Sequence, residues 1–170
     1  MILDDLHLIS LKNVLKKMNI QHLSENQKKE LVFLWHKLKP WKDSIKGLNY
    51  LGRSYITCSL SNGNINLQKN LFRYSNLNFN VIFSAENFKK YKPDSSVYLG
   101  AASNLGLDPR ECFLVASHKN DLLAADKEGF KTIFIRRENE YGKYSEKFKE
   151  KPFEANLSIS SLEDLKEVVI

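Results

Sequence analysis

The chain has 170 residues, of which 42% are hydrophobic and 27% charged, and its formal net charge is +6. This length and composition suit one hydrophobic core with an appendage, and they exclude a disordered chain. The sequence has no apolar run near the roughly 20 residues of a membrane span, and its first ten residues lack the basic flank of a signal peptide. We therefore expect a soluble, cytoplasmic protein with no membrane partner.

The positive charge is concentrated in the first 92 residues, whereas Asp and Glu outnumber Lys and Arg in the remainder. Such an asymmetry can attract anions, from nucleic acid to a small carboxylate. The lysines are nevertheless spread singly along amphipathic patterns, so solvated helix faces are the simpler interpretation and nucleic acid is not the expected partner. Cys58 and Cys112 lie in apolar runs and are read as reduced core thiols, without a disulfide or zinc site.

Residues 1–38 show apolar residues at helical spacing in two runs, which predicts two helices joined by a short turn. The segment Ser24-Glu-Asn-Gln27 is a capping box for the second helix. Pro40 cannot continue that helix, so we place a domain boundary beside it. The predicted domains are a partial helical cap over residues 1–38 and an α/β core over residues 39–170.

The remainder of the chain alternates strand and helix patterns. Strands are predicted at 55–60, 80–84, 112–116, 131–135 and 156–159, and helices at 43–53, 64–74, 95–105, 120–128 and 161–169. Strict alternation at this spacing predicts an α/β fold whose parallel sheet has helices on both faces.

Polar side chains follow the first three predicted strands of this core. Singly, each suits a helix cap or a first turn. Together they place a hydroxyl, an amide, an ammonium and a carboxylate at the carboxyl edge of one sheet, where ligands of such folds bind. Capping does not call for a lysine there. The residues are Ser61, Asn62, Lys92, His118 and Asp121.

Three segments carry a family resemblance: LSNGN, YKPD..VY..AA..LGL.P.E and VASHKNDLLAA...G.KTIFI.R..EYG. They resemble the second, third and fourth motifs of the haloacid dehalogenase superfamily, and closely those of its 2-haloacid dehalogenase (type II) branch. LDDLH, W..LKPW.D...GL..L and FSAE are also similar to that branch. The resemblance implies a Rossmann-like core with a helical cap.

The resemblance further implies attack by an aspartate carboxylate on the halogen-bearing carbon of a 2-haloacid, followed by hydrolysis of the ester. Ser61 and Asn62 match residues that hold the substrate carboxylate and the departing halide, and Tyr98 matches a tyrosine near that site. Lys92 matches the lysine that keeps the nucleophile ionised. Asp121 matches the carboxylate that orients lysine and water, and His118 falls beside the hydrolytic water.

Ala116 stands where magnesium-dependent phosphatases of the superfamily carry an aspartate. We therefore expect no metal and no cofactor. Asn120 stands where some dehalogenases place an aromatic wall of the halide pocket, so the sequence does not select one haloacid as the substrate.

The first motif of the superfamily, an Asp-x-x-Gly-Thr-like turn that supplies the nucleophile, does not occur in these 170 residues. Asp4 and Asp5 match the cap helix instead. We expect an N-terminally truncated chain whose first, central strand is missing between strands 55–60 and 112–116, and which is inactive alone. Exposed strand edges favour self-association or a complementing chain.

Two alternatives stay open at this point. One is a related small-molecule hydrolase completed by a second chain. The other is a non-catalytic module that binds an anion or nucleic acid through the positively charged half. Phosphate binding weakens steeply as salt rises, whereas a small-acid pocket depends on Ser61, Asn62 and Lys92.

Overall fold

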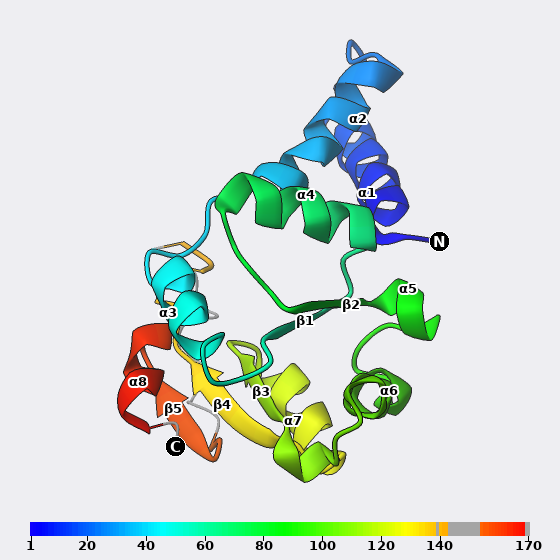
Figure 1. The fold of residues 1–170 in the computed structure, drawn as a ribbon. Helices are drawn as coiled ribbons and strands as arrows, with labels where there is room; N and C mark the ends of the chain where they lie inside the picture. The colour runs from blue at the N-terminus through cyan, green and yellow to red at the C-terminus, as the bar shows by residue number, and fades with distance from the viewer. Residues whose placement is uncertain (139, 143–153, 169–170) are drawn as a thin grey trace.

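A computed structural model describes residues 1–138, 140–142 and 154–168, and for residues 167 and 168 it describes the backbone alone. Figure 1 shows α1 (Leu3–Lys17) and α2 (Glu25–Phe33) side by side at one end of the molecule. The short helix η1 (Leu34–Lys37) follows α2 and packs on α4 (Ile65–Ser75). None of the helices among these described residues is long and apolar enough to cross a membrane.

The strands form two parallel sheets. β1 (Cys58–Ser61) pairs with β2 (Val81–Ser84), and β3 (Phe113–Ala116) pairs with β4 (Lys131–Ile135), which pairs with β5 (Leu157–Ile159). β1 and β3 are not paired with each other. Each therefore keeps one edge that receives no strand among the described residues.

Helices connect these strands and cover them. In the described part of the chain, the remaining helical elements are α3 (Ser44–Leu51), α5 (Ala85–Phe88), α6 (Ser95–Leu105), η2 (Pro109–Glu111), α7 (Lys119–Lys127), η4 (Leu162–Asp164) and α8 (Leu165–Val168).

Two clusters of buried residues show that the three-stranded sheet is covered on both faces. Leu114 of β3 belongs to a cluster with residues of α6 and α7, including Tyr98 and Leu122. Ile133 and Ile135 of β4 point to the opposite face, where they pack with Leu165 of α8. Side chains alternate between the two faces of a strand, which is why neighbouring residues serve different clusters.

Most predicted elements are present with shifted ends. The bounds of β4 and α6 are as predicted, and the capping box at Ser24 forms, with its hydroxyl accepting the Gln27 amide at 3.2 Å. The first strand begins at Cys58 rather than at residue 55, because the Tyr55 amide binds the Leu51 carbonyl in the turn after α3 and the Thr57 amide binds the Asn80 side chain. The polar segment 138–154, for which the sequence predicts a surface loop, lies largely outside the described residues.

Candidate active site at the carboxyl ends of the strands

Lys92, Tyr98 and Asp121 form a connected polar cluster. The Lys92 ammonium is in direct contact with Oδ2 of Asp121, and the Tyr98 hydroxyl donates to Oδ1 of the same carboxylate at 2.7 Å. The side chains of Lys92 and Asp121 are 16% and 17% exposed, and Tyr98 is fully buried. Both carboxylate oxygens thus have a donor, and the ammonium retains two further N–H groups for an anion.

The local sequence explains how these side chains meet. Lys92 lies in the turn between α5 and α6, Tyr98 lies on the buried side of α6, and Asp121 is in the first turn of α7 directly after β3. Asp94 caps α6 by accepting the Ser96 amide at 3.0 Å. Asp121 does not serve as a cap, because its oxygens face Lys92 and Tyr98.

Burial raises the pKa of the Tyr98 hydroxyl, and the hydrogen bond to the Asp121 carboxylate raises this pKa further. An ionised tyrosine beside a carboxylate would add like charge in a partly dry site. Tyr98 therefore remains a protonated donor across the neutral range and holds Asp121 in one orientation.

Asn62 binds the backbone of Lys92 at both ends of its amide. Its Oδ1 accepts the Lys92 amide proton at 2.7 Å, and its Nδ2 donates to the Lys92 carbonyl at 3.2 Å. Ser61 accepts the Gly63 amide at 3.0 Å, which leaves its own hydroxyl proton for donation. The structure thus brings Asn62 to the lysine as a backbone clamp, a role that its position after a strand did not reveal. Substrate contact by Ser61 and Asn62 stays a prediction.

His118 lies apart from the cluster. Its Nε2 is 2.7 Å from Oε1 of Glu140, and its ring is tilted against that of Tyr141. The His118 side chain is 57% exposed, and its backbone carbonyl accepts the Asp121 amide at 3.1 Å. His118 therefore occupies the N-cap position before α7, while its side chain contacts the segment after β4. Its predicted place beside a water stays a prediction.

A cavity of about 640 Å³ lies between the unpaired edges of β1 and β3. Most of its wall is apolar, and Lys92 and Asp121 contribute charged groups to it. Cys58 and Cys112 also line it, and burial raises the pKa of both thiols. Lining side chains from the strands include Leu60, Phe83, Leu114, Val115, Ala116, Ile133 and Ile135.

The donor set of this site does not resemble a site for a hard divalent cation. Within the described residues, no group of three His, Cys, Asp or Glu side chains is placed to hold a metal. Asp121 has both oxygens engaged, and Ala116 brings no oxygen ligand from its side chain.

Gln68 is a buried residue that sequence reasoning missed. Its Nε2 donates to the carbonyls of Gly63 at 2.8 Å and Phe83 at 3.1 Å, and its Oε1 accepts from Ser59 at 2.7 Å. These bonds fix the turn after β1. The only sequence signal was a glutamine on the apolar side of an amphipathic helix, where a polar residue needs partners.

The sequence model of the haloacid dehalogenase-like hydrolase family matches residues 4–135. The chain is 33% identical over 128 residues to (S)-2-haloacid dehalogenase 4A of Burkholderia cepacia, covering 72% of this chain and 55% of that protein. It is also 33% identical over 121 residues to (S)-2-haloacid dehalogenase 1 of Pseudomonas sp. (strain CBS-3), covering 69% and 53%. The chain thus spans about half the length of these relatives.

Solved structures agree with the sequence matches. The crystal structure of the L-2-haloacid dehalogenase PA0810 superposes with a TM-score of 0.93 at 36% identity, covering 98% of this chain and 71% of that chain. The defluorinating L-2-haloacid dehalogenase Rha0230 gives a TM-score of 0.93 at 35% identity, covering 98% and 69%. The predicted Rossmann-like α/β fold is therefore confirmed. This chain belongs to the haloacid dehalogenase-like hydrolase family, in its 2-haloacid dehalogenase-like branch.

Proposed function

We propose that this chain carries the substrate-binding and water-orienting part of a site that hydrolyses the carbon–halogen bond of 2-haloacids. The nucleophilic carboxylate would come from a strand outside these 170 residues that enters the cavity between β1 and β3. The observation that carries the proposal is the Lys92–Asp121–Tyr98 cluster, whose Lys92 and Asp121 line this cavity beside two strand edges that are unpaired among the described residues.

The shape of the cavity supports a strand as its occupant. Among the described residues β1 and β3 each pair on one side only, so each has backbone N–H and C=O groups without a strand partner on the other side. Strands in a sheet lie about 4.7–4.9 Å apart, and one further parallel strand would join the two sheets into one. Apolar side chains dominate the wall, which suits a buried parallel strand.

The charges support an aspartate at the carboxyl end of that strand. There the carboxylate would meet the Lys92 ammonium, whose positive charge favours the ionised, nucleophilic form. One carboxylate oxygen would form an ester bond to the carbon as the carbon–halogen bond breaks and halide leaves with the electron pair. Asp121 would then help to orient the water that hydrolyses the ester, releasing a 2-hydroxyacid and restoring the aspartate.

Substrate recognition is proposed for the groups around Lys92. The substrate carboxylate is expected to accept from the Ser61 hydroxyl and nearby amides, while Asn62 fixes the backbone of Lys92. The engaged oxygens of Asp121 and the absence of a side-chain oxygen at Ala116 support a reaction without a divalent cation. The proposed domain division, with residues 1–38 as a partial cap, assigns α1 and α2 to the cover of this site.

The proposal is tested by measuring chloride release from (S)-2-chloropropionate with the 170-residue chain, alone and with a peptide. The peptide would carry an apolar strand followed by Asp-x-x-Gly-Thr, and its matched control would carry Asn in place of that aspartate. We expect no release from the chain alone, release with the Asp peptide, and none with the Asn peptide or with Lys92→Met. Peptide binding is followed separately by Trp fluorescence.

Two results would overturn the proposal. Release by the chain alone would show that the nucleophile lies within these 170 residues. Binding of the Asp peptide without any chloride release would show that the completed site is not a dehalogenase site.

A further inference from the structure

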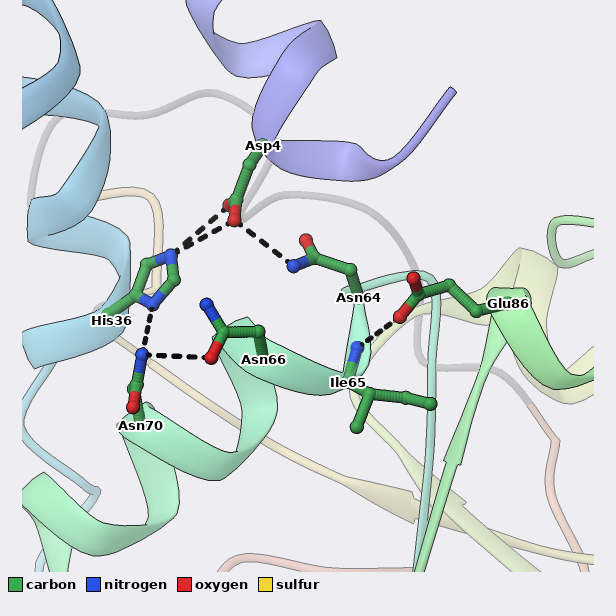
Figure 2. A network of polar contacts seen from close by, with 7 residues as sticks. All are labelled: Asp4, His36, Asn64, Ile65, Asn66, Asn70 and Glu86. Carbon is green, nitrogen blue, oxygen red and sulfur yellow. Dashed lines mark hydrogen bonds and ion pairs between the residues drawn. The ribbon is translucent and has the colours of Figure 1, made fainter.

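A second polar network joins the start of α1 to the turn after β1, from Ser61 to Asn64. Figure 2 shows Asp4 of α1 between His36 of η1 and Asn64, the residue before α4. Nε2 of His36 lies 3.2 Å from both Asp4 oxygens, and Nδ2 of Asn64 donates to Asp4 at 3.0 Å. The Asp4 carboxylate thus binds two residues that lie 32 and 60 positions further along the sequence.

The partners of the His36 ring define its tautomer. Nδ2 of Asn70 lies 3.1 Å from Nδ1 of His36, so Nδ1 accepts and the ring proton is on Nε2, facing Asp4. His36 is only 2% exposed, and its ring stacks on Phe33 with centroids 4.4 Å apart. The ring therefore has one orientation, which connects α1 to α4.

The Asn64 side chain binds Asp4 and does not cap the helix that it precedes. It occupies the N-cap position of α4, yet its side chain makes no capping hydrogen bond. The Ile65 amide at the helix start is instead bound by Glu86 of α5. Asn64 is 2% exposed, and its Oδ1 is one of the buried atoms left without a hydrogen-bond partner among the described residues. Helix stability alone does not favour this arrangement. If Asn64 capped α4, its Oδ1 would accept a backbone N–H of the first turn, so that both the buried oxygen and the helix N–H would have a partner.

The turn from Ser61 to Asn64 transmits this attachment to the lysine. The Gly63 carbonyl is held by Gln68 and by Ser84, each at 2.8 Å. One residue earlier, Asn62 binds the backbone of Lys92 at both ends. A second link runs alongside, since the Tyr91 hydroxyl donates to the Met1 carbonyl at 2.8 Å, next to Lys92. The start of α1 is thus attached to both segments that set the position of the ammonium group.

We propose that Asp4 and His36 are positioning residues, which couple the docking of α1 to the placement of Asn62 and Lys92. With α1 in place, Asp4 fixes Asn64, and the turn presents Asn62 to the lysine backbone. Without the Asp4 contact, the turn loses its attachment to the cap helices and the Lys92 backbone gains freedom. The inference rests on the proposed site for its functional meaning, but the measurement below uses no substrate, so it can succeed or fail independently of dehalogenation.

The test is hydrogen exchange of the Lys92 amide, the proton bound by Asn62, in the free 170-residue chain. We expect Asp4→Ala and His36→Leu to speed exchange of this amide about tenfold or more, because each removes partners from a buried hydrogen-bonded group. His36→Gln should restore near-normal exchange, since the glutamine amide carries a donor and an acceptor at a similar separation. Amides of β4, remote from the turn, are the internal reference and should not change.

Glu25→Gln is the matched control. It removes the ion pair of Glu25 with Lys12, which joins α2 to α1, and the one with Lys28 inside α2, and should leave Lys92 exchange unchanged. The proposal is overturned if Lys92 exchange is unaltered in Asp4→Ala. It is equally overturned if Lys92 and the β4 amides accelerate together, because the network would then only stabilise the whole fold. Asp4→Ala decides the question even where His36→Leu fails to fold.

Discussion

Asp121 and Asp4 are two carboxylates of similar exposure, 17% and 22%, that bind different kinds of donor. Asp121 receives a lysine ammonium and a tyrosine hydroxyl and contributes to the wall of the cavity. Asp4 receives a neutral imidazole N–H and an amide N–H, and lies in the first turn of α1 facing the turn before α4. A carboxylate paired with a fixed cation sets an electric field that a ligand can use. A carboxylate paired with neutral donors keeps its net negative charge, which does not attract an anion, and holds its partners in place.

The two sites should differ most in the free energy of unfolding that is lost when the carboxylate of each is replaced by a neutral amide. Asp121→Asn leaves the partly buried Lys92 ammonium without its counter-ion, and we expect a loss of about 2–4 kcal/mol in the free energy of unfolding. Asp4→Asn replaces an acceptor of neutral donors and should cost about 1–2 kcal/mol. Urea unfolding at pH 7 measures both. Equal losses would mean that the charge of Lys92 adds nothing to the first cluster.

Tyr98→Phe sharpens the comparison by removing a neutral donor from the charged cluster. We expect a loss of about 1–2 kcal/mol at pH 7, because the ring stays buried and one hydrogen bond is lost. The pKa of Tyr98 is raised in the folded chain. Its contribution is therefore fully present below the unfolded pKa of about 10 and declines as the pH rises through the folded value.

The difference in unfolding free energy between wild type and Tyr98→Phe should accordingly shrink above about pH 10. Measurements from pH 7 to pH 11 test this. A difference that stays constant over that range would contradict the buried, protonated state of the hydroxyl.

The smallest effect is expected at Glu25, a carboxylate with two lysine partners on the surface. Hydrogen bonds from Lys12 and then Lys28 lower the pKa of Glu25 to about 2, and its side chain is 57% exposed. The stabilising effect is present above the unfolded pKa and is lost as the pH falls towards 2. Because water screens exposed pairs, Glu25→Gln should change Tm by less than about 2 °C at pH 7. A decrease in Tm as large as that caused by Asp121→Asn would contradict the expectation that the more buried carboxylate contributes more to stability.

Local sequence patterns were sufficient to predict the fold and two residues of the site, Lys92 and Asp121. Alternating strands and helices, the capping box at Ser24 and the polar residues after each strand are patterns within about ten residues of chain. Lys92 and Asp121 were both predicted, because strand ends of a parallel sheet meet at one edge. The structure places their side chains in direct contact, and their catalytic roles stay predictions.

The contacts that sequence reasoning missed join distant residues. The Asn64 side chain reads locally as a helix cap, whereas Asp4, 60 residues earlier, takes its amide. His36 lies in an apolar helical pattern that carries no sign of its partners on α1 and α4. The helix α5 was missed because its four residues are too few to show a period.

The cavity also gives the chain a built-in chemical probe. Cys58 and Cys112 are the two cysteines of the sequence, one at the start of β1 and the other directly before β3, and both line the cavity. Alkylation requires the thiolate, and burial raises the pKa of both thiols, so their modification should be slow at neutral pH and faster as the pH rises. A strand that filled the cavity would shield both thiols at once. Native cysteine labelling therefore reads out whether the two sheets stand apart or have been joined, without any change to the sequence.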